Sequence, residues 1–143
     1  MAPDDLDEII DIEKSSTPSP WSRELFAKEL KHDHSFNLVA RSQCGEKKKL
    51  AGYIVYWAVA DEMHILNLAV HPDERRKGIG RTLVLEAMKR ARDRGLIHSF
   101  LEVRSGNEPA IALYETFQFK KVGERKSYYK DGEDAIIMAL ELN

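Results

Sequence analysis

MHILNLAVHPDERRKGIGRTLVLEAMKRARDRG, residues 63–95, is the stretch of the chain that decides the fold. Residues 63–70 are mostly apolar, which is typical of a buried strand, and His71-Pro72 ends that strand. From Ile79 onward, apolar residues recur every three or four positions, and Gly95 is a helix stop signal. The stretch therefore predicts a strand followed by an amphipathic helix, with a short loop between them.

The loop between this strand and helix is cationic and rich in glycine. A helix N-terminus carries free backbone N–H groups and the positive end of the helix dipole, so it binds anions, and phosphate in particular. Glycines allow a ligand to approach the backbone closely. The candidate phosphate-binding residues are Arg75, Arg76, Lys77, Gly78, Ile79, Gly80 and Arg81.

Two familiar phosphate loops do not fit this sequence. A Walker-type loop has Gly-Lys-Ser/Thr, whereas Gly80 is followed by Arg81 and Thr82. The dinucleotide fingerprint has a third glycine at the position of Leu83. We therefore interpret the loop as a handle that grips phosphate without hydrolysing it; the alternative is an exposed turn that is basic without a ligand.

Length and composition limit the class of protein. A chain of 143 residues has the size of one domain, so we expect a single domain over residues 1–143. The net charge of −2 argues against a general nucleic-acid-binding protein. No apolar run has the length of a membrane span, the N-terminus does not resemble a signal peptide, and the only cysteine is Cys44. We expect a cytoplasmic protein with no membrane partner and no direct nucleic-acid partner.

Helices and strands are also predicted on both sides of the central stretch. Their order predicts a mixed α/β (α+β) fold, in which helices flank a curved, mixed, mostly antiparallel sheet. The predicted helices are 3–14, a short helix capped by Ser22, and 107–117, and the predicted strands are 36–41, 50–60, 99–104, 119–126 and 134–142. Residues 15–21 and 42–49 are predicted to be a loop and a polar turn.

At this point the residues resemble a known family. Arg75-x-x-Gly78-x-Gly80, with LNLAVHP before it and LEVRSGNEPAIALYE after it, resembles the acetyl-CoA loop of the GNAT superfamily of N-acetyltransferases. More narrowly, SPWS (19–22), GYIVYW (52–57) and YYKDGEDAIIMAL (128–140) are similar to the ribosomal-protein-alanine N-acetyltransferases, RimI. The resemblance extends over nearly the whole chain.

The resemblance implies an enzyme that moves acetyl from acetyl-CoA to a protein N-terminal amine. The implied acceptor is the N-terminal alanine of a small-subunit ribosomal protein, and no metal is implied. Two alternatives stay open, namely a lysine or small-molecule amine as acceptor, and an inactive acyl-CoA-binding module. We expect a monomer or a weak dimer.

The resemblance also implies roles for residues that bind the co-substrate. It assigns the pyrophosphate to residues 75–81, and the pantetheine arm to the backbone of Leu68, Ala69 and Val70. Asn107 matches a CoA-contacting asparagine, and it is also a good helix cap. Residues 68–70 can alternatively be core strand residues with no ligand.

Two residues match the family's catalytic pair, Glu102 as general base and Tyr114 as the acid that protonates the CoA thiolate. Strand alternation places Glu102 on the face opposite Leu101 and Val103. The alternative for Glu102 is a solvated carboxylate or an ion pair with Arg104. The alternative for Tyr114 is a core aromatic residue.

Trp21, Tyr128, Tyr129 and Asp134 would flank the acceptor groove by resemblance, although Trp21 and Tyr129 are equally well explained as packing residues. Two departures from the family pattern are visible. Only MAP precedes the first helix, where the family has a strand, and Gln118 stands where the family has glycine. If that position has a positive φ, Gln118 strains the end of the helix.

Overall fold

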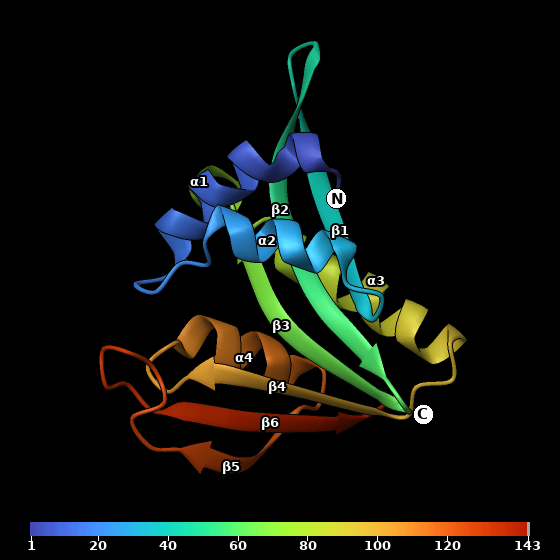
Figure 1. Cartoon of the computed structure of the whole chain (residues 1–143), viewed down its shortest axis with the longest axis vertical. Helices are drawn as coiled ribbons and strands as arrows, with labels where there is room; N and C mark the ends of the chain where they lie inside the picture. The colour runs from blue at the N-terminus through green and yellow to red at the C-terminus, as the bar shows by residue number, and fades with distance from the viewer. Residues whose placement is uncertain (143) are drawn as a thin grey trace.

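A six-stranded sheet in the order β1-β2-β3-β4-β6-β5 forms the centre of the computed structural model, which describes residues 1–142 (Figure 1). Within these residues only β3 and β4 pair in parallel. The strands are β1 (Ser35–Cys44), β2 (Lys47–Val59), β3 (Glu62–Val70), β4 (His98–Arg104), β5 (Lys120–Arg125) and β6 (Ala135–Glu141). The helices are η1 (Pro3–Asp5), α1 (Leu6–Ser16), α2 (Arg23–Lys31), η2 (Pro72–Glu74), α3 (Ile79–Asp93) and α4 (Glu108–Thr116). The predicted fold class is confirmed.

The helices cover the two faces of the sheet unequally. On one face, α3 and α4 bury a large core that includes Leu83, Leu101 and Met138. On the other face, α1 and α2 bury a smaller core around Ile9 and Phe26, over β1 to β3 only. Figure 1 shows that β4, β6 and β5 are left uncovered on this second face. This uncovered half of the sheet is where the candidate site lies.

Strand β2 has cores on both sides, which explains its sequence. Residues 50–56 are all buried, with Tyr53 and Val55 in the smaller core and Ile54 and Tyr56 in the larger one. A strand covered on both faces is apolar throughout and does not alternate. This explains the continuous apolar run of the sequence there.

Several predicted boundaries were wrong, and local hydrogen bonds explain the differences. The first helix extends to Ser16, because Ser15 and Ser16 donate their hydroxyls to the carbonyl of Ile12 at 2.8 and 2.6 Å. The predicted polar turn over 42–49 is mostly strand: Ser42 pairs with Lys49, and the β1–β2 hairpin continues to Cys44 and Lys47. The predicted helix over 3–14 begins as the short 3-10 helix η1 rather than as an α-helix.

The two departures from the family pattern have clear structural outcomes. Residues 1–5 contain η1 and no strand, and the amino group of Met1 donates to the Asn37 carbonyl at 3.4 Å. Gln118 has a φ of 75°, so the expected left-handed residue is present at the end of α4. This conformation costs a non-glycine residue about 1–2 kcal/mol.

Gly52 in β2 is required by close packing, which leads to a stability prediction. A Cβ at this position would lie 2.8 Å from the carbonyl oxygen of Ala69 in the neighbouring strand. We expect Gly52→Ala to destabilise the protein by about 1–3 kcal/mol, because backbone must move to relieve the contact. Urea unfolding measures this change.

Gly123 provides the matched control for Gly52. It also lies in the sheet, but a Cβ there would be 3.6 Å from Ile137, an ordinary contact. Gly123→Ala is therefore expected to unfold at nearly the wild-type urea concentration. Equal losses for the two variants would contradict the steric explanation.

Candidate active site

The parallel strands β3 and β4 separate in the middle of the sheet, and the site begins at this opening. Their pairing ends at Ile65 and Leu101, although β3 continues to Val70 and β4 to Arg104. Within residues 1–142, the edge of β3 from Leu66 to Val70 that faces β4 therefore has no strand partner. A cavity of about 200 Å³ lies at this opening.

The free edge of β3 contains Leu68, Ala69 and Val70, the residues expected to hold the pantetheine arm. Their other edge pairs with β2, where Ala69 lies opposite Tyr53. Ala69 is buried, and Leu68 and Val70 are half-buried, so these residues also belong to the packed sheet. The two interpretations are compatible, because the side chains pack while the backbone edge that faces β4 has no strand partner among the described residues.

The α3 N-terminus lies beyond the end of β3 and exposes backbone donors. Gly78 is the cap residue, with a φ of 80° and no side-chain hydrogen bond to the helix. The first intrahelical bond from the N-terminal turn is donated by Thr82 to the Gly78 carbonyl, at 3.0 Å. The N–H groups of Ile79, Gly80 and Arg81 therefore have no intrahelical acceptor, as expected for an anion-binding helix end.

The cations of this loop have different environments. Arg75 donates to the Val70 carbonyl at 3.3 Å, and Lys77 pairs with Glu74 at 3.1 Å. Arg81 turns away from the loop, donates to Thr116 at 3.1 Å and lies 5.0 Å from the centre of the Phe117 ring. Arg76 is exposed and has no hydrogen bond or ion pair to residues 1–142, so its charge is available to a ligand.

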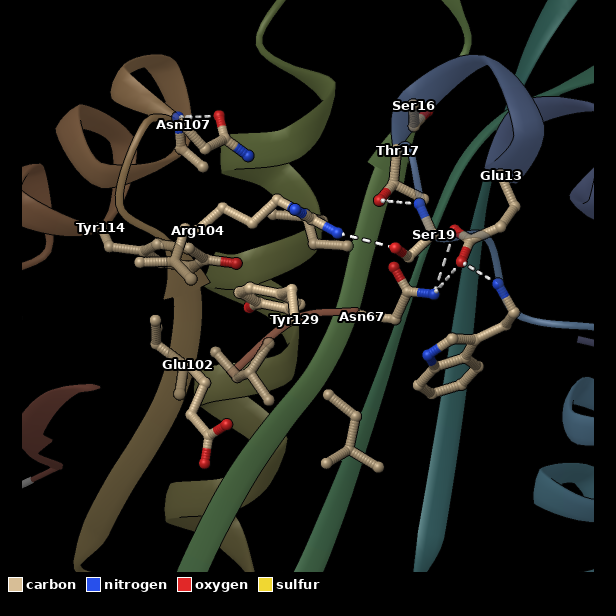
Figure 2. A pocket seen from close by; sticks show the side chains of 17 residues that line it. Glu13, Ser16, Thr17, Ser19, Asn67, Glu102, Arg104, Asn107, Tyr114 and Tyr129 are labelled. Carbon is tan, nitrogen blue, oxygen red and sulfur yellow. Dashed lines mark hydrogen bonds between the residues drawn. The ribbon is translucent and has the colours of Figure 1, made fainter. Parts of the chain in front are cut away.

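The structure brings Glu102, Tyr114 and Asn107 to the same cavity, from β4, from α4 and from the α4 cap (Figure 2). Asn107 also accepts the Ala110 N–H at 3.3 Å, so its capping role is confirmed. The three residues are close in space because the β4–α4 turn folds the helix back over the strand end.

Glu102 is on the face of β4 that the sequence pattern predicted. Leu101 and Val103 are buried in the larger core, and the Glu102 side chain remains 31% exposed. Its ion-pair partner is Arg125 of β5, at 3.2 Å, and not Arg104. The ion pair with Arg104 that we considered is therefore wrong.

Tyr114 is nearly enclosed, with 5% of its surface exposed. Its ring packs edge-on against Phe119, with the ring centres 5.6 Å apart. Burial raises the pKa of the Tyr114 hydroxyl well above its ordinary value of 10. The phenol is therefore fully protonated at physiological pH, so it can act as a proton donor.

A second cavity of about 490 Å³ continues from the first over the uncovered face of β4. Trp21 lines both cavities, and its ring also packs against Phe26 with the ring centres 5.2 Å apart. Tyr128 lines the second cavity and is half exposed, and the neighbouring Glu102 carboxylate, together with partial burial, raises the pKa of its hydroxyl.

Asp134 lies outside both cavities, unlike the other predicted acceptor residues. Its carboxylate accepts the Ser127 N–H at 2.8 Å and pairs with Lys126 at 3.3 Å. Hydrogen bonding from the Ser127 backbone, together with Lys126, lowers the pKa of Asp134. The side chain closes the base of the loop between β5 and β6, which is a structural role.

Glu13 of α1 lines the first cavity, and the sequence pattern did not single it out as a site residue. Its buried carboxylate accepts hydrogen bonds from the Tyr53 hydroxyl at 2.6 Å, the Asn67 side-chain amide at 3.1 Å and the backbone N–H of Trp21 at 2.9 Å. In the sequence, Glu13 stands at helical spacing from Leu6 and Ile9, and a carboxylate at such an otherwise apolar position was the only available signal. The network fixes the end of α1 and the end of the α1–α2 loop against β2 and β3.

The model of the Acetyltransferase (GNAT) family matches residues 6–119, which is most of the chain. The chain belongs to the GNAT family, and it is an acetyl-CoA-dependent N-acetyltransferase. Among helices of residues 1–142, none combines the length and hydrophobicity needed to span a bilayer.

Within this family the chain is similar to enzymes that act on protein N-termini. It is 37% identical to the [Ribosomal protein bS18]-alanine N-acetyltransferase of Escherichia coli K12, over 97% of this chain and 93% of that protein. It is also 37% identical to an N-alpha-acetyltransferase of Saccharolobus solfataricus, over 97% of this chain and 89% of that protein. The crystal structure of the Escherichia coli ribosomal-protein-S18-alanine enzyme matches 100% of this chain and 91% of its own, with a TM-score of 0.88.

Proposed function

We propose that this enzyme acetylates the α-amine of a protein N-terminus, and that the acceptor is the N-terminal alanine of a small-subunit ribosomal protein in the cytoplasm. The observation that carries the proposal is the convergence of Glu102 and Tyr114 on one cavity at the β3–β4 opening. The similarity to enzymes that act on the alanine of bS18 supports the choice of acceptor.

The residues around the opening fit acetyl-CoA as co-substrate. The unpaired edge of β3 offers backbone hydrogen bonds to the amides of the pantetheine arm, which need partners when they are buried. The uncapped start of α3 and Arg76 offer donors and charge to the pyrophosphate. The co-substrate supplies the activated acetyl thioester.

In the proposed reaction, the neutral acceptor nitrogen attacks the carbonyl carbon of the acetyl thioester, and the carbon–sulfur bond then breaks. Glu102 takes the proton that the nitrogen loses, directly or through a water molecule. Tyr114 donates a proton to the departing thiolate. Proximity has to favour this last transfer, because a buried phenol is a weaker acid than a thiol in water.

The raised pKa of Tyr114 gives a prediction for the pH profile. The protonated phenol is the active form, so a higher pKa extends activity to higher pH. We expect kcat/KM for a peptide to rise as the acceptor α-ammonium group loses its proton and becomes the neutral amine, near pH ~8. It should then stay level to about pH 10.

Initial rates between pH 6 and pH 10 measure this profile, with folding checked at each pH. A fall in kcat/KM between pH 8 and pH 9.5 in folded enzyme would contradict the assignment of the acid to Tyr114. A rise centred near pH ~10 would instead indicate a lysine acceptor.

The free charge of Arg76 gives a prediction for co-substrate binding. We expect Arg76→Glu to raise the KM for acetyl-CoA on the order of tenfold, because a charge that assists phosphate binding becomes repulsive. The side chain has no ion pair to residues 1–142, so stability should not change. Lys89→Glu makes the same charge change on an exposed position of α3 and serves as the control. An equal rise in both variants would show a general charge effect.

The release of CoA thiol from acetyl-CoA tests the proposed function. The acceptors to compare are a peptide that begins Ala-Arg, the same peptide with a blocked N-terminus and a free lysine, and a set of small amines. We expect turnover with the free N-terminus only. Turnover with lysine or small amines alone would overturn the choice of acceptor, and no turnover with any amine would indicate an acyl-CoA-binding protein.

A further inference from the structure

Arg104 is the last residue of β4, and its side chain crosses the first cavity. It lies two residues after Glu102 and on the same face of the strand, and its side chain is only 11% exposed. Figure 2 shows the guanidinium reaching from the strand toward the loop between α1 and α2. No role was predicted for Arg104 beyond an ion pair with Glu102, which the structure does not contain.

The guanidinium joins two loops that are distant in sequence. One nitrogen, Nη2, donates to the Ser19 hydroxyl of the α1–α2 loop at 2.9 Å. The other, Nη1, binds Asp131 and Glu133 of the β5–β6 loop, both at 2.9 Å. The guanidinium carbon also lies 4.0 Å from the centre of the Tyr129 ring, in the same β5–β6 loop. One side chain therefore connects both loops to the end of β4.

These contacts occupy the guanidinium, which argues against direct binding of a substrate by Arg104. Both terminal nitrogens have protein acceptors, and one face of the group is covered by Tyr129. Burial acts to lower the pKa of Arg104, but hydrogen bonds to Glu133 and Asp131 raise it overall, so the charge is permanent. A charged group with partners on both sides holds those partners in place.

Glu133 extends the connection to a third segment. Its second carboxylate oxygen accepts the Gly106 N–H at 2.8 Å, in the turn that leads from β4 to Asn107 and α4. The same carboxylate therefore links the β5–β6 loop to the turn that positions Asn107 and Tyr114. Removing Arg104 would leave Asp131 and Glu133 as mutually repelling charges in the β5–β6 loop, without their cationic partner.

The two loops that Arg104 joins also hold aromatic residues of the acceptor groove. Trp21 lies two residues after Ser19, and Tyr128 and Tyr129 lie in the β5–β6 loop beside Asp131. All three aromatic residues line the second cavity. Arg104 therefore joins the two loops that form opposite walls of this cavity.

We propose that Arg104 is a positioning residue that sets the spacing of the two loops that bind the acceptor peptide. This inference rests on the proposed function, because it requires a peptide acceptor in the second cavity. It assigns Arg104 to acceptor binding and not to co-substrate binding. Within residues 1–142, no hydrogen bond or ion pair joins this guanidinium to the α3 loop that would hold the phosphates, and Glu133 contacts the turn before Asn107 through the Gly106 N–H, without Arg104.

The test is to separate the Michaelis constants of the two substrates. For Arg104→Gln we expect the KM of the Ala-Arg peptide to rise on the order of tenfold, and the KM of acetyl-CoA to change less than about twofold. Arg104→Lys should show a smaller rise, since an ammonium can hold one loop but cannot reach both. General destabilisation lowers the amount of active enzyme and leaves both Michaelis constants unchanged.

Arg41→Gln is the matched control. Arg41 of β1 also pairs with a largely buried carboxylate, that of Asp5 in η1. Neither residue lines either cavity. We expect its loss to lower stability and to leave the peptide KM unchanged. Equal rises in both Michaelis constants for Arg104→Gln, or the same peptide effect in Arg41→Gln, would overturn the proposal.

Ser19→Ala provides an independent variant in case Arg104→Gln does not fold. It removes only the contact of Arg104 with the α1–α2 loop. We expect the peptide KM of Ser19→Ala to rise about threefold. Adding Ser19→Ala to Arg104→Lys should not raise the peptide KM above that of Arg104→Lys alone. Fully additive effects would mean that Ser19 contacts the peptide by itself, and an unchanged peptide KM would overturn the proposal. If the wild-type enzyme acetylates no peptide, the proposed function fails; if it does so and these variants behave like wild type, only the role of Arg104 fails.

Discussion

Tyr114→Phe is expected to lower kcat by about 10²–10³-fold and to leave the KM of acetyl-CoA unchanged. The variant removes only the hydroxyl, so the edge-on packing against Phe119 is retained and the fold should be stable. Without the proton donor, the thiolate must leave unprotonated or take a proton from water, which general acid catalysis avoids. Thiol release with saturating peptide measures the change.

Tyr56→Phe is the control for this prediction. Tyr56 is also buried, at 1% exposure, but it lies in the larger core against Phe36 and lines neither cavity. We expect its kcat to equal that of the wild type. A Tyr114→Phe enzyme with undiminished kcat would reduce Tyr114 to a core aromatic residue, the alternative that the sequence left open.

Glu102→Gln is expected to lower kcat/KM for the peptide by about 10²–10³-fold at pH 7, where the acceptor amine is mostly protonated. The same fold loss is expected at pH 9, because Glu102 takes the proton that the neutral nitrogen loses when it attacks, and this step is the same at both pH values. The lost ion pair with Arg125 is partly exposed, and such pairs contribute at most about 1 kcal/mol, so the variant should stay folded. Rates at both pH values measure the effect.

Glu124→Gln provides the control for Glu102. Glu124 lies on β5 beside the same half of the sheet, and its partners are Lys121 and Lys126 at the surface. Its removal should leave kcat/KM unchanged at both pH values. Full activity of Glu102→Gln at pH 7, or the same loss in Glu124→Gln, would exclude Glu102 as the base.

Much of the fold followed from local sequence signals, and the errors occurred where local signals were weak. The strand, glycine loop and helix of residues 63–95 are placed as predicted, because strand composition, cap glycine and helical period agree there. The glycine of the family pattern also raised the question of a positive φ at Gln118, and the structure answers it with a φ of 75°. By contrast, Ser42 and Lys49 look like turn residues, yet cross-strand pairing extends the hairpin through them.

The parts of the site that depend on distant pairings could not be predicted. Strand alternation placed Glu102 on the correct face, but its partner Arg125 is set by the β4-β6-β5 order of the sheet. Arg104 and Ser19 are 85 residues apart in the chain, and their contact depends on how two loops meet across the cavity. The hydrogen bonds of Glu13 to Tyr53 and Asn67 likewise join α1 to two different strands.

The most direct test of the central claim is one reaction with a single peptide that carries both kinds of amine, a free N-terminal alanine and an internal lysine. After incubation with acetyl-CoA, tandem mass spectrometry locates the added acetyl group. The cavity formed by Glu102 and Tyr114, with its flanking acceptor groove, predicts acetyl on the α-amine and an unmodified lysine. Acetyl on the lysine, or no acetylated peptide with enzyme that binds acetyl-CoA, would contradict the proposed function.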